Sequence, residues 1–151
     1  MNCPLCKRNP TAHSFLHFGS TSNGIPLYYT APAKATARDD AYSLSALRLH
    51  LAAITDPWTW VLDCTGMEIH NQHTMQFSVA FADMLVTEHA RTLRKIIVIR
   101  PNPWIYRVVH VLRDDIKRMV VFANTPMEIL KATTDFSSDA KTWLRLVGAK
   151  S

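Results

Sequence analysis

RKIIVIRP, residues 94–101, gives the strongest strand signal in this 151-residue chain. Four consecutive β-branched residues, from Ile96 to Ile99, follow two basic residues and end before Arg100 and a proline. A half-exposed strand alternates apolar and polar residues, so an unbroken apolar run predicts a strand that is covered on both faces. Such strands occupy the centre of parallel sheets. The segment therefore predicts an α/β protein.

Helices and strands are expected to alternate on both sides of this segment. Asn102-Pro103 and Thr125-Pro126 are each a helix N-cap followed by proline at the first helical position. The other strands are predicted at residues 25–31, 59–66 and 119–123, and the other helices at residues 39–54, 71–89 and 138–147. The helix after Asn102 is predicted to bury Ile105, Val109, Leu112 and Ile116 along one face. This order predicts a mostly parallel sheet flanked by helices.

The first 23 residues differ in kind from the rest and contain a candidate metal site. Cys3, Cys6, His13 and His17 have the spacing C-x2-C-x6-H-x3-H. Zinc prefers four nitrogen or sulfur ligands, and two cysteines two residues apart reach one ion from a tight turn. A site with four protein ligands is closed, so the expected role is structural. The alternative is that thiols and exposed histidines lie close by chance.

Composition and motif placement predict the domain organisation of the protein and its cellular compartment. We predict two parts, a zinc-knuckle segment at residues 1–23 and an α/β domain at residues 24–151. The start MNCPLCKR lacks the apolar core of a secretory signal, and three cysteines do not form a disulfide framework. We therefore expect a cytoplasmic protein. The formal charge of +5 permits an anionic partner without choosing one.

Catalytic motifs are absent from the sequence: it has no GxSxG, P-loop, GxGxxG or HExxH. Asp63 follows a predicted strand, where α/β sheets place functional groups, yet it is also an ordinary turn residue. Glu68, His70 and His73 are read as solvated groups in preference to a second metal site. Cys64 is read as an inert, packed thiol. The expectation is a protein that is not an enzyme.

The order of several weak motifs resembles the CRAL-TRIO lipid-binding family. The matching residues are Gly24, Pro26, Tyr28, Asp63, Gly66, Asn102, Pro103 and Trp104. The resemblance covers residues 24 to about 132 and implies a shortened, divergent member, since the family's helical N-terminal region and its C-terminal signature are missing. The STAS domain, a small α/β sandwich, is the second candidate, and VVFANTPMEIL at residues 120–130 suits its last strand and helix.

The resemblance to CRAL-TRIO implies non-enzymatic binding of a lipid or another hydrophobic ligand between the sheet and its helices. The side chains expected to line that site are Met75, Phe77, Phe81, Met84, Trp104 and Val108. Arg100 and Arg107 are expected to meet a phosphate or an anionic membrane surface. For each apolar residue taken singly, simple core packing is the competing interpretation.

Two other functions stay open from the sequence. One is a protein-interaction module of the same or the STAS-like fold without a ligand, for which the resemblance to CRAL-TRIO implies a partner such as a small GTPase. The other is zinc-dependent nucleic-acid binding, against which the short spacing between the cysteines and histidines and the lack of a basic run both argue.

Overall fold

Five strands form one sheet, and their order in the sheet is their order in the chain. The computed structural model describes residue 8 and residues 14–34, 40–68 and 75–149. The strands are β1 (Leu16–Ser20), β2 (Pro26–Thr30), β3 (Trp58–Asp63), β4 (Leu93–Ile99) and β5 (Val120–Ala123). β1 and β2 form an antiparallel hairpin, and every later neighbour is parallel. The predicted α/β class with a mostly parallel sheet is confirmed.

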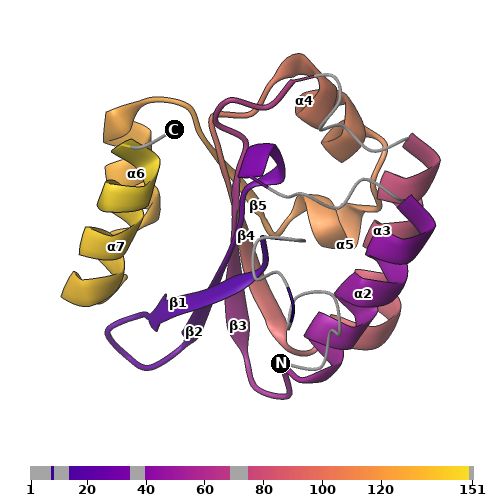
Figure 1. Cartoon of the computed structure of the whole chain (residues 1–151), viewed down its shortest axis with the longest axis horizontal. Helices are drawn as coiled ribbons and strands as arrows, with labels where there is room; N and C mark the ends of the chain where they lie inside the picture. Colours follow the sequence, from indigo (N-terminus) through magenta and orange to yellow (C-terminus); the bar gives the residue numbers. More distant parts are fainter. Residues whose placement is uncertain (1–7, 9–13, 35–39, 69–74, 150–151) are drawn as a thin grey trace.

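Helices cover both faces of this sheet (Figure 1). One face holds α2 (Asp40–Ala52), α3 (Met75–His89), α4 (Pro103–His110) and α5 (Asp114–Lys117), and the other holds α6 (Pro126–Ala132) and α7 (Ser138–Ala149). A short 3-10 helix, η1 (Pro32–Lys34), follows β2. Parallel strands added in one direction by right-handed crossovers place all their connecting helices on one face. The chain after β5 returns over the opposite face, so α6 and α7 cover it.

Alternation along the strands divides the core into two clusters. Trp60, Ile96 and Val98 pack under α2, α3, α4 and α5, whereas Val61 and Ile97 face α6 and α7. Successive side chains of a strand point to opposite faces, so the apolar run in β4 supplies both clusters. β4 has neighbours on both sides, as the sequence predicted for a central strand.

The predicted helix after Asn102 is wrong in its length. Asn102 caps α4 by accepting a hydrogen bond from the Ile105 backbone N–H at 2.9 Å, but α4 ends at His110. A separate helix, α5, begins at Asp114. Asp114 and Asp115 in its first turn favour a new helix N-terminus, because carboxylates stabilise that end of the helix dipole. The predicted apolar stripe persists across the break, since Ile105 and Ile116 are both buried in one cluster.

Residues 19–24 contain the end of β1 and the turn into β2. β1 contacts α7, and an isolated bridge joins Thr21 to Phe136 just before α7. The hairpin is therefore part of the sheet and ties the start of the described chain to its last helix. Among the described residues, no helix is both long and apolar enough to cross a bilayer.

Candidate functional site

The carboxyl ends of β2, β3 and β4 bring together a linked set of polar side chains. The set consists of Tyr29, Lys34, Asp63, Thr65 and Arg100, and we call it the carboxyl-edge network. Each member lies at or just beyond the carboxyl end of one of these strands. Open α/β sheets bind ligands beyond the carboxyl ends of their strands.

Asp63 is the centre of the network and is only 2% exposed. Its Oδ2 accepts a hydrogen bond from the Tyr29 hydroxyl at 2.6 Å. Its Oδ1 accepts from the Thr65 backbone N–H at 3.0 Å and from the Thr65 hydroxyl at 2.6 Å. A buried carboxylate needs such donors, since desolvation of an unpaired charge is costly. Asp63 thus has the turn role predicted from the sequence and also fixes two neighbouring side chains.

Tyr29 links Asp63 to a lysine at one end of the network. The Lys34 Nζ donates to the Tyr29 hydroxyl at 3.4 Å and to the Val147 carbonyl in α7 at 3.4 Å, and it lies 5.5 Å from the centre of the Tyr29 ring. Burial raises the pKa of the Tyr29 hydroxyl above its ordinary value. The hydrogen bond to Asp63 and the negative charge of Asp63 raise it further, by smaller amounts. The phenol therefore stays protonated and donates to Asp63.

Arg100 forms the other end of the network. Its Nη1 donates to the Thr65 hydroxyl at 3.1 Å, and the residue is exposed. Arg100 has a backbone φ of 47°, which lies in the left-handed region that favours glycine. It also precedes Pro101, and a following proline disfavours helical backbone at that position. Strained residues of this kind cluster at functional sites, where the surrounding structure holds them in place.

Cys64 lies between Asp63 and Thr65 but does not take part in the network. Burial, together with the Asp63 charge, raises the pKa of its thiol to about 12. A nucleophilic cysteine needs an accessible thiolate, and this group is 3% exposed and protonated near neutral pH. The predicted inert, packed thiol agrees with this environment.

The residues predicted to line a lipid site lie on α3 and α4, and Phe81, Met84 and Trp104 belong to the core cluster on that face of the sheet. Phe77 and Met84 are buried, and Phe77 stacks on Phe81 with ring centroids 6.3 Å apart. Phe81 in turn meets Trp60 edge-on at 5.5 Å. Met75, Trp104 and Val108 are half-buried, on α3 and α4. Arg107 is exposed on α4, and no described contact joins it to Arg100.

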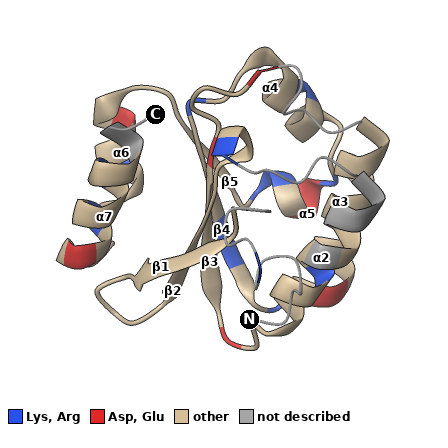
Figure 2. Ribbon diagram, viewed as in Figure 1, with Lys and Arg blue, Asp and Glu red and all other residues tan. Residues whose placement is uncertain are grey.

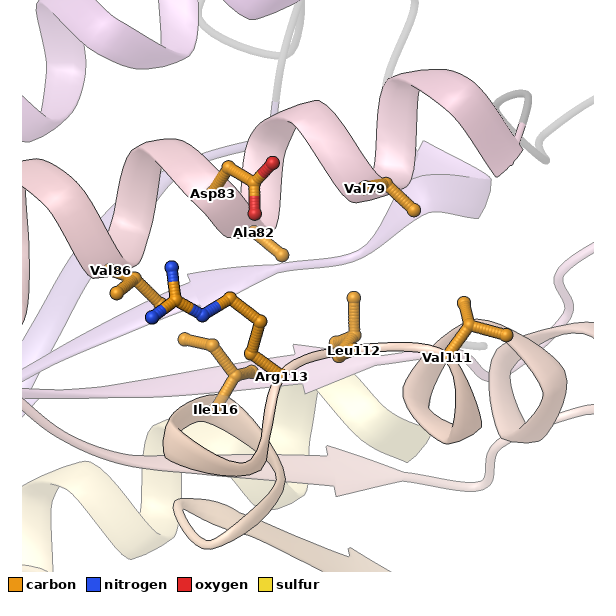
Figure 3. Close-up of a pocket in the computed structure, with 8 residues that line it drawn as sticks. All are labelled: Val79, Ala82, Asp83, Val86, Val111, Leu112, Arg113 and Ile116. Carbon is orange, nitrogen blue, oxygen red and sulfur yellow. The ribbon is translucent and has the colours of Figure 1, made fainter.

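One groove lies between α3 and the turn from α4 to α5 (Figure 3). Apolar side chains such as Val79, Val86 and Leu112 form its walls, and Asp83 and Arg113 project there from opposite sides. It holds about 30 Å³, the space of one or two water molecules, whereas ligand sites hold roughly 300–1,000 Å³. The groove is too small for a lipid acyl chain.

The predicted zinc ligands fall mostly outside the described residues. Cys3, Cys6 and His13 lie there, as do His70 and His73 of the second, less favoured cluster. His17 is described: it lies in β1, is exposed, and its ring centroid is 5.2 Å from that of Tyr28. The described residues alone contain no group of three or more potential metal ligands.

Neither the protein-family models nor the curated protein sequences compared with this chain gave a match. Among the residues that the structure describes, lysines and arginines lie on helices of both faces of the sheet (Figure 2). Sequence reasoning missed Tyr29 and Lys34 as members of the site. A usable signal was present, since Tyr29 and Asp63 are polar residues at the carboxyl ends of apolar strands that precede helical segments.

Proposed function

We propose that this protein is a non-enzymatic binding module that recognises a phosphate-bearing ligand at the carboxyl-edge network. Lys34 and Arg100 supply the positive charge, and the guanidinium offers donors beyond the one bonded to Thr65. The observation on which the proposal rests is the exposed Arg100, held by Thr65 with left-handed backbone at the ligand-binding edge of the sheet.

Electrostatics support an anionic ligand. Within the described chain no ion pair joins Lys34 or Arg100 to a carboxylate, and both Asp63 oxygens already accept bonds from Tyr29 and Thr65. The two cations at the ends of the network are thus left with donors for another acceptor. Charged donors form short, strong hydrogen bonds with phosphate oxygens.

The same groups support binding without catalysis. Cys64 is buried and protonated, and Asp63 has its carboxylate committed to Tyr29 and Thr65. A general base needs a free acceptor within reach of its substrate. Arg100 and Lys34 offer donors to a ligand, whereas Asp63 offers no free acceptor and Cys64 no thiolate.

The phosphate-bearing ligand can be a soluble molecule or the head group of an acidic lipid. The second case keeps part of the lipid-binding prediction. The protein would bind only the head group, and the acyl chains would stay in the membrane, since the groove between α3 and α5 is too small for them. It also agrees with the basic net charge of the chain. The resemblance to CRAL-TRIO and the membership of Met75, Phe77, Phe81, Met84, Trp104 and Val108 in a pocket stay predictions.

The test is a titration with inorganic phosphate, followed by backbone amide chemical shifts. We expect shifts at Thr65 and Arg100 with a dissociation constant of about 1 mM, corresponding to about −4 kcal/mol. Arg100→Gly should weaken binding about tenfold, since it removes one charge-assisted contact and keeps a residue that accepts the backbone. Arg145→Ala, which changes an exposed arginine on α7, should bind as the wild type does.

Vesicles distinguish the two sources of phosphate. Co-sedimentation with phosphatidylcholine vesicles that contain phosphatidic acid, but not with pure phosphatidylcholine, assigns the ligand to a membrane. Binding of inorganic phosphate without vesicle binding assigns it to solution. Equal phosphate affinity in the wild type and in Arg100→Gly would remove the carboxyl-edge network as the site.

A further inference from the structure

The two cations of the carboxyl-edge network belong to strands that are not neighbours. Lys34 ends η1, which follows β2, and Arg100 directly follows β4. In the sheet, β3 lies between these two strands. Neighbouring strands are about 4.8 Å apart, so the carboxyl ends of β2 and β4 are about 10 Å apart. The two cations are therefore held at separate points of one edge of the sheet.

A chain of four hydrogen bonds connects the cations and keeps them apart. The chain runs in order through Lys34, Tyr29, Asp63, Thr65 and Arg100. Tyr29 and Asp63, in the middle of this chain, are both buried in the sheet. A shift of either side chain would disturb the packing around it, so the middle of the network is rigid. The separation of the cations is thus set by the fold.

A single phosphate group is too small to bind both cations. Its oxygens are about 2.5 Å apart, so at ordinary hydrogen-bond lengths it joins nitrogen atoms at most about 8 Å apart. The Asp63 carboxylate also lies between the two cations in the network and repels an anion that is centred there. A phosphate bound at Arg100 therefore leaves the donors of Lys34 unused.

A diphosphate group has the length that the two cations require. Its outermost oxygens are about 5 Å apart, so it joins nitrogen atoms up to about 11 Å apart. The Arg100 guanidinium has donors beyond the one bonded to Thr65. The Lys34 ammonium has three donors, of which two bond to the Tyr29 hydroxyl and the Val147 carbonyl. Each cation can thus bind one of the two phosphates.

The surface beside the network is open and carries a further donor. Gly66 follows Thr65 in the turn after β3, and its backbone N–H makes no hydrogen bond within the described part of the chain. A Cβ added at Gly66 would have only the Ala33 Cβ within 4 Å, at 3.9 Å. Ala33 in turn precedes Lys34. Small residues therefore connect the two cationic ends and leave room for an anion.

We propose that the ligand of the carboxyl-edge network carries a diphosphate group, with one phosphate at Arg100 and the other at Lys34. The inference rests on the phosphate site proposed above and names the class of its ligand. Charge-assisted hydrogen bonds hold both phosphates, and the bridging oxygen passes Thr65 and Gly66. A soluble diphosphate ester and a lipid with a diphosphate head group would make the same contacts.

Titration with inorganic diphosphate, without divalent metal ions, tests the inference beside the phosphate titration. The wild type should bind diphosphate about tenfold more tightly than phosphate, since a second charge-assisted contact is added. Backbone amide shifts should extend from Thr65 and Arg100 to Lys34. Methylenebisphosphonate, which has the spacing of diphosphate, should bind as diphosphate does. A bisphosphonate with a butylene spacer carries the same two charged groups farther apart and should bind no more tightly than phosphate.

A matched pair of variants locates the second phosphate. Lys34→Met removes the charge and keeps the length of the side chain. It should weaken diphosphate binding about tenfold and leave phosphate binding unchanged, since phosphate binds at Arg100. Lys141→Met makes the same change at an exposed position on α7 and should alter neither affinity. Circular dichroism shows whether each variant is folded, and the two bisphosphonates test the spacing in the wild type alone.

The outcomes separate this inference from the proposed function. Equal affinity for phosphate and diphosphate, or diphosphate binding that Lys34→Met does not weaken, would overturn the inference and keep the phosphate site at Arg100. Tight binding of the butylene-linked bisphosphonate would also overturn it, because charge alone would then explain the affinity. A wild type that binds neither phosphate nor diphosphate would overturn the proposed function together with the inference.

Two diphosphate esters then identify the source of the ligand. Binding of ADP in solution indicates a soluble diphosphate ester. Co-sedimentation with phosphatidylcholine vesicles that contain diacylglycerol diphosphate, without binding of ADP, indicates a lipid head group. Either result supports a diphosphate group as the ligand.

Discussion

At the scale of single residues, the Asp63 carboxylate is buried and therefore needs hydrogen-bond donors. The hydrogen bonds described for it come from a side chain or amide fixed by a strand end or turn. The carboxylate therefore holds Tyr29 and Thr65 in one arrangement. Lys34 and Arg100 are positioned through these two residues in turn.

The Tyr29–Asp63 bond should be visible in stability. Tyr29→Phe is expected to lower the free energy of unfolding by about 2 kcal/mol, and Asp63→Ala by about 3 kcal/mol, since each removes a partner of a buried polar group. The double variant should lose less than the sum, with a coupling of about 1–2 kcal/mol. Urea denaturation measures all three.

Tyr28→Phe is the matched control for this cycle. Tyr28 neighbours Tyr29 in β2 but points to the other face of the sheet, where it packs against Phe15 and Trp58 through its ring. Removing its hydroxyl keeps those ring contacts, so the change should stay within about 0.5 kcal/mol. Additive losses in the Tyr29 and Asp63 variants would show that the two groups do not act as a pair.

At the scale of elements, the first hairpin and the last helix depend on one close approach. A Cβ at Gly19 in β1 would lie 2.9 Å from the Cβ of Ala140 in α7. Ala140 is fully buried. Small residues on both sides therefore let α7 lie against β1, and the bridge from Thr21 to Phe136 continues this contact.

Gly19→Ala should accordingly destabilise the protein by about 1–3 kcal/mol through overpacking. Ala140→Gly alone should cost about 1 kcal/mol, as glycine does within a helix. The double variant should lose less than the two changes added together, because the methyl group at residue 19 then meets no Cβ. Thermal unfolding followed by circular dichroism gives the comparison.

Gly24→Ala provides a contrast by a different mechanism. Gly24 has a φ of 92° in the β1–β2 turn, and nothing lies within 4 Å of a Cβ added there. Its replacement should cost stability through backbone strain alone, and Ala140→Gly should not relieve that cost. Relief at both glycines would mean that the effect of Ala140→Gly is not a local contact.

At the scale of the whole molecule, the start of the chain is joined to the domain through β1. His17, a predicted zinc ligand, is exposed in this strand and so is held in place by the sheet. A metal bound by Cys3, Cys6, His13 and His17 would then tie the first residues to β1. We propose this as the role of the zinc, a structural link in place of a reaction centre.

Elemental analysis tests the zinc prediction. The purified protein should contain one zinc per chain, and Cys3→Ser and His17→Ala should each lose it, with a lower melting temperature. His110→Ala, which removes an exposed histidine from α4, should keep the metal and the melting temperature. A metal-free protein with the same melting temperature would leave the cysteine–histidine motif without a structural role.

Local patterns were enough to predict most of the elements, but not β1 (Leu16–Ser20), which lies in the part of the chain predicted as a zinc-knuckle segment. The Ile96–Ile99 run, the Asn102-Pro103 and Thr125-Pro126 caps and the apolar strand before Asp63 all correspond to the observed β4, α4, α6 and β3. These signals report on burial and capping within a few residues, which is the range over which backbone conformation is chosen. The sequence pattern did not predict the break between α4 and α5, because the apolar stripe continues through it.

The carboxyl-edge network, by contrast, depends on contacts between residues of different strands. Asp63 meets Tyr29 from 34 residues away, and Arg100 meets Thr65 from 35 residues away. No local pattern encodes such contacts, since they exist only once β2, β3 and β4 lie side by side in parallel register. The composition of the strands thus determines the class of fold, whereas the order of the strands in the folded sheet determines which polar groups contact each other. The cause is physical: backbone conformation responds to near neighbours, and a binding edge forms only from distant ones.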